Sequence, residues 1–147
     1  MYLDSSIIVK LLTKEEDSRF FQEALKGKAL SSSELARTEV HSALLAKERA
    51  QRITVEQRTS AWETFERLVD SEQIRIHKLN SVTLKRATRI LAAVHPDVPL
   101  RTLDAIHLAA CDMSQDFPLC TTDKRMRDAA KLLKIPLFPD ETEQTSR

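Results

Sequence analysis

Short apolar runs alternate along the chain with longer segments in which apolar residues recur every three or four positions. The first pattern is typical of buried strands and the second of amphipathic helices. The predicted strands are 2–3, 29–30, 74–77, 118–121 and 135–138. The predicted helices are about 7–12, 20–25, 35–51, 55–69, 82–94, 103–111 and 123–133. This alternation predicts a mainly parallel sheet covered by helices on both faces, a three-layer α/β/α sandwich.

Small polar residues and one glycine mark the expected ends of these helices. Residues 31–33, all serine, and Thr54, Ser81 and Thr102 precede helical segments, where a side-chain oxygen accepts a hydrogen bond from a free backbone N–H. Gly27, the single glycine of the chain, is placed to end the helix at 20–25. The chain therefore carries a start or stop signal near most of its predicted helices.

Composition limits the protein to ordinary globular classes. The 147 residues are 41% hydrophobic, enough for one cored domain over 1–139, followed by a polar tail at 140–147. Since 23 Lys and Arg nearly balance 22 Asp and Glu, net charge does not identify a partner. Without a leader or an apolar run of roughly 20 residues, we expect a soluble, cytoplasmic protein. Cys111 and Cys120 lack a metal-ligand spacing and are expected to be buried free thiols.

Two aspartates follow predicted strands directly. Asp4 comes after strand 2–3 and Asp123 after strand 118–121, and each precedes a helix. The carboxyl ends of parallel strands share one edge of a sheet, where ligand sites gather. Asp is also a favoured helix N-cap, stabilising by about 1 kcal/mol. Position alone therefore predicts capping as readily as chemistry.

Two further acids lie in apolar surroundings. Glu39 has Leu35, Ala36 and Ala43 as helical neighbours, whereas a solvated Glu usually lies opposite such a stripe. Asp104 lies within the mostly apolar segment 103–110, although an Asp in the first turn is also favoured by the helix dipole. Taken singly, each is explained equally well by structure and by function.

The four acids together predict a metal site. Carboxylates gathered at low dielectric resist ionisation unless a cation compensates them. Mg²⁺ and Mn²⁺ prefer oxygen ligands and need no His or Cys. Such a site activates water and offsets charge on an attacked phosphate. We therefore expect a metal-dependent phosphodiester hydrolase.

Each of the four acids lies in a distinctive short segment. The segments are Tyr2-Leu3-Asp4-Ser5-Ser6 with 7–12 after it, Arg37-Thr38-Glu39-Val40, Arg101-Thr102-Leu103-Asp104-Ala105-Ile106-His107-Leu108-Ala109, and Thr121-Thr122-Asp123. In this order they resemble the acidic motifs of PIN-domain ribonucleases, most closely the VapC-type toxins of bacterial type II toxin–antitoxin systems. The resemblance covers nearly the whole chain.

This resemblance implies a site, an activity and partners. It implies an endoribonuclease that depends on Mg²⁺ or Mn²⁺, with the four acids as catalytic and metal-binding residues. It also implies a homodimer, neutralised by a cognate antitoxin whose tail occupies the active-site groove. By the same likeness, Ser6 and Thr121 orient the acids or water. Beside the motifs, Arg37, Arg101 and Lys124 are candidates for RNA phosphate contacts, although such residues are more often simply solvated.

Neighbours of the motif acids leave some alternatives open. Glu34 lies five residues before Glu39 and competes with it, but the Arg-Thr-Glu-Val context favours Glu39. His107 lies one helical turn after Asp104, within reach of a hydrogen bond, although a packed or surface histidine is the more common role.

Other functions of parallel α/β proteins fit less well. A phosphoacceptor module needs an Asp at the end of a central strand, where this chain has Leu79-Asn80. A phosphatase with an Asp-x-Asp motif needs Asp where Ser6 stands. The alternatives that remain are a catalytically silent binding module of the same fold and a DNA-cleaving nuclease.

Overall fold

The computed structural model describes residues 1–140, in which five strands alternate with seven helices. None of these helices is both long and apolar enough to cross a membrane. Residues 141–147 of the predicted polar tail lie outside the described residues. The strands are β1 (Tyr2–Leu3), β2 (Leu30–Ser33), β3 (Ile74–His77), β4 (Leu119–Cys120) and β5 (Leu137–Phe138). The helices are α1 (Ser5–Leu12), α2 (Ser18–Leu25), α3 (Leu35–Arg49), α4 (Val55–Asp70), α5 (Ser81–Val94), α6 (Thr102–Ser114) and α7 (Lys124–Leu132).

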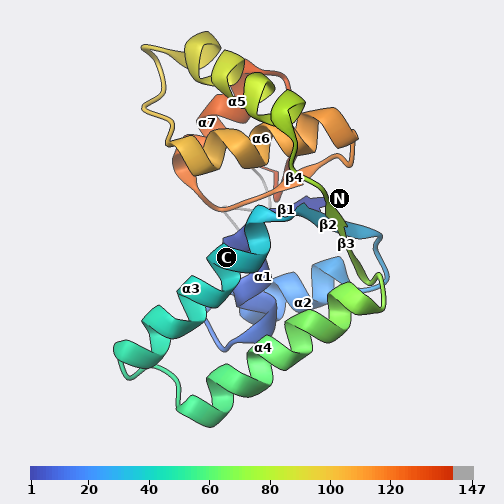
Figure 1. Cartoon of the computed structure of the whole chain (residues 1–147), viewed down its shortest axis with the longest axis vertical. Coiled ribbons are helices and arrows are strands. Elements are labelled where there is room, and N and C mark those ends of the chain that lie inside the picture. The colour runs from blue at the N-terminus through green and yellow to red at the C-terminus, as the bar shows by residue number, and fades with distance from the viewer. Residues whose placement is uncertain (141–147) are drawn as a thin grey trace.

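The five strands form one sheet in the order β3-β2-β1-β4-β5, and every pairing is parallel. Figure 1 shows α5, α6 and α7 above this sheet and α1 to α4 below it. The predicted three-layer α/β/α sandwich is therefore confirmed. The first strand, β1, is central, with β2 on one side and β4 on the other. In such sheets ligands bind where the strand order reverses, beyond the carboxyl ends of the strands.

Alternate residues of the central strands enter different cores, as the two-residue period of a strand requires. Tyr2 and Leu119 pack in the core beneath α5, α6 and α7. Leu3 and Cys120 pack in the other core, with α1 to α4. Cys111 and Cys120 are buried free thiols, as predicted. Burial raises the pKa of Cys111 to about 12, so this thiol stays protonated and unreactive at neutral pH.

The serines at 31–33 are not helix caps, which corrects the prediction. They belong to β2, which pairs with β1 and β3. All three are buried, and the Ser32 hydroxyl donates to the Leu3 carbonyl at 2.8 Å. Such small polar residues break the apolar pattern by which strands are recognised, so sequence reasoning ended this strand too early.

Two other predicted caps are also wrong, whereas Thr54 is confirmed as the cap of α4. Asn80, not Ser81, caps α5, because its Oδ1 accepts hydrogen bonds from two backbone N–H groups. Thr102 is the first residue of α6, and Arg101 occupies the N-cap position without a capping side-chain bond. Asn is as good a cap as Ser, so their order along the chain could not decide between them.

The buried stripe of α5 contains Ala87, Ile90 and Val94, which follow the helical period. The apolar Leu84 is 48% exposed, whereas the polar Thr83 is buried. Thr83 lies four residues before the buried Ala87, so it continues the buried stripe of α5, a helix that packs mainly against α6.

Candidate functional site

The carboxyl edge of the sheet carries a pocket of about 300 Å³ beside the ends of β1 and β4. All four acids named from the sequence line it, although they come from four separate segments. A larger pocket of about 600 Å³ lies at the opposite edge, and none of the four acids lines it. The smaller pocket is lined by Asp4, Ser5, Ser6, Glu39, Arg101, Asp104, His107, Thr122, Asp123 and Met126.

Asp4 is held in place by neutral donors. Its Oδ1 accepts hydrogen bonds from the backbone N–H of Ile7 at 2.9 Å and from the Ser6 hydroxyl at 2.7 Å. Its Oδ2 accepts one from the Thr121 hydroxyl. Burial raises the pKa of the Asp4 carboxyl, and the hydrogen bonds from Thr121 and Ser6 lower it only in part. Asp4 is therefore both the cap of α1 and a buried carboxylate short of positive charge.

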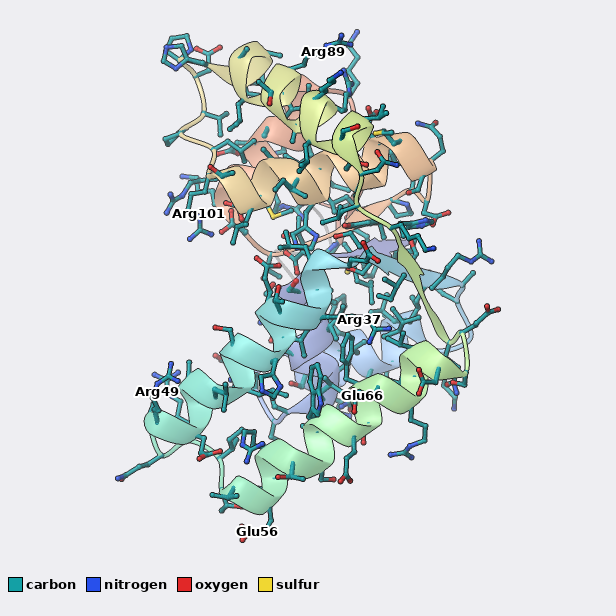
Figure 2. The ribbon with its side chains drawn as sticks, in the orientation of Figure 1. Arg37, Arg49, Glu56, Glu66, Arg89 and Arg101 are labelled. Carbon is teal, nitrogen blue, oxygen red and sulfur yellow. The ribbon has the colours of Figure 1, made fainter. Side chains whose placement is uncertain are left out.

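Asp104 and Asp123 share a guanidinium. Arg101 Nε donates to Asp104 Oδ2 at 2.8 Å, and its Nη2 lies 3.6 Å from Asp123 Oδ2. Asp123 also caps α7 by accepting from the backbone N–H of Met126 at 3.0 Å. Arg101, named from the sequence for RNA phosphate contact, thus pairs with two pocket acids while its side chain stays 59% exposed at the start of α6 (Figure 2).

Glu39 reaches the pocket from α3. Its Oε2 accepts hydrogen bonds from the Ser5 hydroxyl at 2.5 Å and is 2.6 Å from His107 Nε2. Although burial raises the pKa of the Glu39 carboxyl, His107 and Ser5 outweigh it and hold that pKa below its usual value. Glu34, its rival in the sequence, instead accepts from the backbone N–H of Leu79 at 2.9 Å and does not line the pocket.

Three polar residues of this pocket were not named as site residues from the sequence, namely Ser5, His107 and Thr122. Ser5 contacts Glu39, whereas only its neighbour Ser6 was named. His107 contacts Glu39 and Ser5, and no hydrogen bond joins it to Asp104, the partner considered from its spacing. The signal for His107 in the sequence was a histidine within the mostly apolar segment 103–110.

The other two basic candidates lie outside the pocket lining. Arg37 on α3, labelled in Figure 2, and Lys124 at the start of α7 are both exposed. Lys10, another basic residue near the first motif, forms ion pairs with Asp17 and Glu15. Of the basic residues beside the motifs, Arg101 is therefore the one that contacts the acids.

The donor set of the pocket suits a hard divalent cation. Carboxylate and hydroxyl oxygens are the ligands that Mg²⁺ and Mn²⁺ prefer. Within residues 1–140, no three Asp, Glu, His or Cys side chains are already arranged around a metal position. The ion pairs of Arg101 and the raised pKa of Asp4 both indicate negative charge that a cation would compensate. The residues therefore fit such an ion, provided that the Arg101 guanidinium moves away from Asp104 and Asp123.

Comparisons with known proteins agree with this geometry. A family model described as PIN domain matches residues 1–132. Ribonuclease VapC46 of Mycobacterium tuberculosis is 38% identical over 141 residues, which cover 94% of this chain and 95% of that protein. The crystal structure of M. tuberculosis VapC20, described as a sarcin-ricin loop cleaving toxin, matches with a TM-score of 0.67. That match has 15% identity, covers 87% of this chain and 93% of the other, and supports the fold. The predicted resemblance is confirmed, and the chain belongs to the PIN-domain family.

Proposed function

We propose that this protein is a metal-dependent endoribonuclease and the toxin of a toxin–antitoxin pair. The observation that carries the proposal is the meeting of four carboxylates in one pocket at the carboxyl edge of the sheet. The similarity to a protein named as a ribonuclease favours RNA as the substrate. The fold shared with a toxin that cleaves the sarcin-ricin loop favours the same biological role.

In this proposal, Asp4, Glu39, Asp104 and Asp123 hold Mg²⁺ or Mn²⁺. When bound, the ion supplies Lewis acidity at the scissile phosphate and lowers the pKa of the attacking water. Ser6 and Thr121 keep both oxygens of Asp4 in a fixed orientation through the hydrogen bonds described above. The carboxylates thus enter the reaction already oriented, so little reorganisation is needed when charge develops on the phosphate.

Arg101 has two partners in this mechanism. Without a bound cation it neutralises Asp104 and Asp123. Because its side chain is more than half exposed, its guanidinium can turn from these acids toward solvent and meet an RNA phosphate at the pocket mouth. Arg37 and Lys124, both exposed, extend positive charge along the approach.

The proposed partners follow from the family. They are an RNA substrate, a cognate antitoxin that blocks the pocket, and a second copy of the chain in a homodimer. The protein acts in the cytoplasm, where its RNA substrates are found.

Cleavage assays with the purified protein test the activity. We expect structured tRNA, ribosomal RNA or messenger RNA to be cut with Mg²⁺ or Mn²⁺, and no cleavage in EDTA. Asp104→Asn should abolish cleavage and keep the circular dichroism spectrum. Asp112→Asn is the matched control, because Asp112 lies on the same helix and pairs with Arg86 outside the pocket. Sequencing RNA ends after induction in cells would identify the substrate.

Three results would overturn the proposal. Undiminished cleavage in EDTA, or full activity of Asp104→Asn, would refute the metal mechanism. Cleavage of DNA with RNA untouched would make the protein a DNA nuclease. Intact RNA in cells after induction, and in every metal condition in vitro, would make it a silent binding module.

A further inference from the structure

A chain of hydrogen bonds in the wall of the pocket joins three elements. The Tyr2 hydroxyl on β1 lies 2.9 Å from His107 Nδ1 on α6. On the other side of the ring, His107 Nε2 lies 2.6 Å from Glu39 Oε2 on α3. Tyr2 is fully buried and His107 is 2% exposed, so water does not compete for these hydrogen bonds. The imidazole is therefore fixed at both of its nitrogens.

The direction of these hydrogen bonds follows from the state of the phenol. Burial raises the pKa of the Tyr2 hydroxyl, so it keeps its proton at neutral pH. With the phenol donating to Nδ1, the ring carries its proton on Nε2 and donates it to Glu39. The other tautomer would place the Nε2 lone pair 2.6 Å from a carboxylate oxygen, which can only accept, so this tautomer is the favoured assignment.

Both donors to Glu39 use the same oxygen. His107 and Ser5 each bond to Oε2, and within residues 1–140 no hydrogen bond reaches Oε1. The Glu39 side chain lines the pocket and is 25% exposed. One oxygen is therefore anchored to the protein, and the other is left available to a ligand.

We propose that His107, itself held by Tyr2, is a positioning residue that anchors Glu39 through Oε2 and leaves Oε1 to bind the divalent cation. This inference rests on the proposed function, because it assumes that Glu39 is a metal ligand. In this role His107 acts through Glu39 and is not itself a metal ligand. Partners of this kind, which orient a metal ligand, typically change metal affinity about 10- to 100-fold when removed.

Mn²⁺ binding to the full chain without RNA, measured by calorimetry, tests this role. His107→Leu keeps a similar volume but removes both nitrogens, and we expect roughly 10-fold weaker binding. His107→Gln retains an amide donor near the position of Nε2 and should recover most of the loss. Tyr2→Phe frees the ring and should give a smaller loss than His107→Leu. His95→Leu, at an exposed histidine, controls for loss of a weak Mn²⁺ ligand.

A double-mutant cycle with Glu39→Gln separates positioning from general damage. If His107 acts through Glu39, His107→Leu should have no further effect on Mn²⁺ affinity in the Glu39→Gln background. Equal losses in both backgrounds would overturn the inference, since the effect would then be structural. Should His107→Leu fail to fold, Tyr2→Phe takes its place in the same cycle. Thermal unfolding of each variant reports stability separately.

The cycle also distinguishes the two proposals. If Glu39→Gln leaves Mn²⁺ affinity unchanged, Glu39 is not a ligand and the proposed metal site is wrong at this residue. If Glu39→Gln weakens binding while His107→Leu does not, the metal site stands and the role of His107 is refuted.

Discussion

Two parts of the pocket hold their carboxylates in opposite ways. Asp4 is surrounded by neutral donors, namely two hydroxyls and one backbone N–H. Asp104 and Asp123 instead face the guanidinium of Arg101. Neutral donors remain in place when a cation binds, whereas a guanidinium competes with the cation for the same oxygens. The donors around Asp4 therefore fix the orientation of its carboxylate. At Asp104 and Asp123, a bound cation replaces the positive charge of Arg101.

The burial of the two parts agrees with this division. Asp4 is 4% exposed, and burial dominates its pKa despite three hydrogen bonds. The Arg101 side chain is 59% exposed and can leave its partners at little cost. A bound cation is therefore stabilised most by Asp4, whose negative charge is least compensated. At Asp104 and Asp123 it needs only the exposed Arg101 side chain to move aside.

Among the changes that test this division of the pocket, Asp4→Asn has the largest expected effect. We expect cleavage to fall on the order of 10³-fold, because metal stabilisation of the reaction is worth several kcal/mol. The fold should be preserved, since Asn still accepts from Ile7 and removes a buried charge. RNA cleavage rates measure the loss of activity, and urea unfolding measures whether the fold is preserved. Asp17→Asn, at the N-cap of α2 outside the pocket, is the control, and wild-type activity of Asp4→Asn would contradict the fixed role of this residue.

Thr121→Val should have the second largest effect. It removes the hydroxyl that donates to Asp4 and that accepts from the backbone N–H of Asp123. We expect a loss of about 1.5–3 kcal/mol in the free energy of unfolding, as for hydrogen bonds to charged groups. Cleavage should fall roughly 10- to 100-fold, less than for Asp4→Asn. Thr88→Val on the exposed face of α5 is the matched control. Equal effects of the two changes would refute the role of Thr121 in orienting Asp4.

Arg101→Gln should have a smaller effect than the two previous changes, and it should strengthen metal binding. Removing the competing guanidinium should strengthen Mn²⁺ binding without RNA by roughly fivefold, the scale of a surface ion pair. RNA affinity should fall, because one phosphate contact is lost. Calorimetry and RNA binding in EDTA measure these changes. Arg89→Gln, at an exposed arginine on α5, should change neither (Figure 2). Weaker Mn²⁺ binding by Arg101→Gln would show that Arg101 supports the site and does not compete with the ion.

The smallest expected effect is a pH dependence of stability in EDTA. Because the Asp4 pKa is raised above its ordinary 3.8, the folded state keeps this proton to higher pH than the unfolded state. The Asp4 contribution to stability is therefore most favourable below pH 3.8 and is lost as pH rises through the folded-state pKa. Urea unfolding from pH 4 to 8 should show wild type losing stability relative to Asp4→Asn. A constant difference between the two proteins would contradict the raised pKa.

The positions of Asp4 and Asp123 could be predicted because their surroundings are local. Each ends an apolar run and begins a helix, and parallel strands then place both at one edge. Glu39 and Glu34 could be separated only by motif context, because both lie near the start of the same helix. In space they diverge, and only Glu39 lines the pocket.

Contacts between distant segments account for what was missed. His107 meets Glu39 across 68 residues and Ser5 across 102, so spacing within one helix pointed instead to Asp104. Arg101 was named for RNA phosphate contact because it lies beside a motif, and its pairing with Asp123 on a separate element could not be seen from spacing. Helix spacing predicts which side chains are neighbours on one helix. Contacts between side chains on different elements depend on how those elements pack, which spacing does not give.

The hydrogen bond between Thr121 and Asp4 joins residues 117 positions apart. It spans β1 and β4, which are adjacent in the sheet although β4 is synthesised long after β1. A chain that has emerged from the ribosome only as far as α6 therefore has Asp4 but lacks the strand, the Thr121 hydroxyl and the fourth carboxylate, Asp123, that complete the pocket. The proposed nuclease site is therefore incomplete until residues 119–123 have been synthesised and β4 has paired with β1.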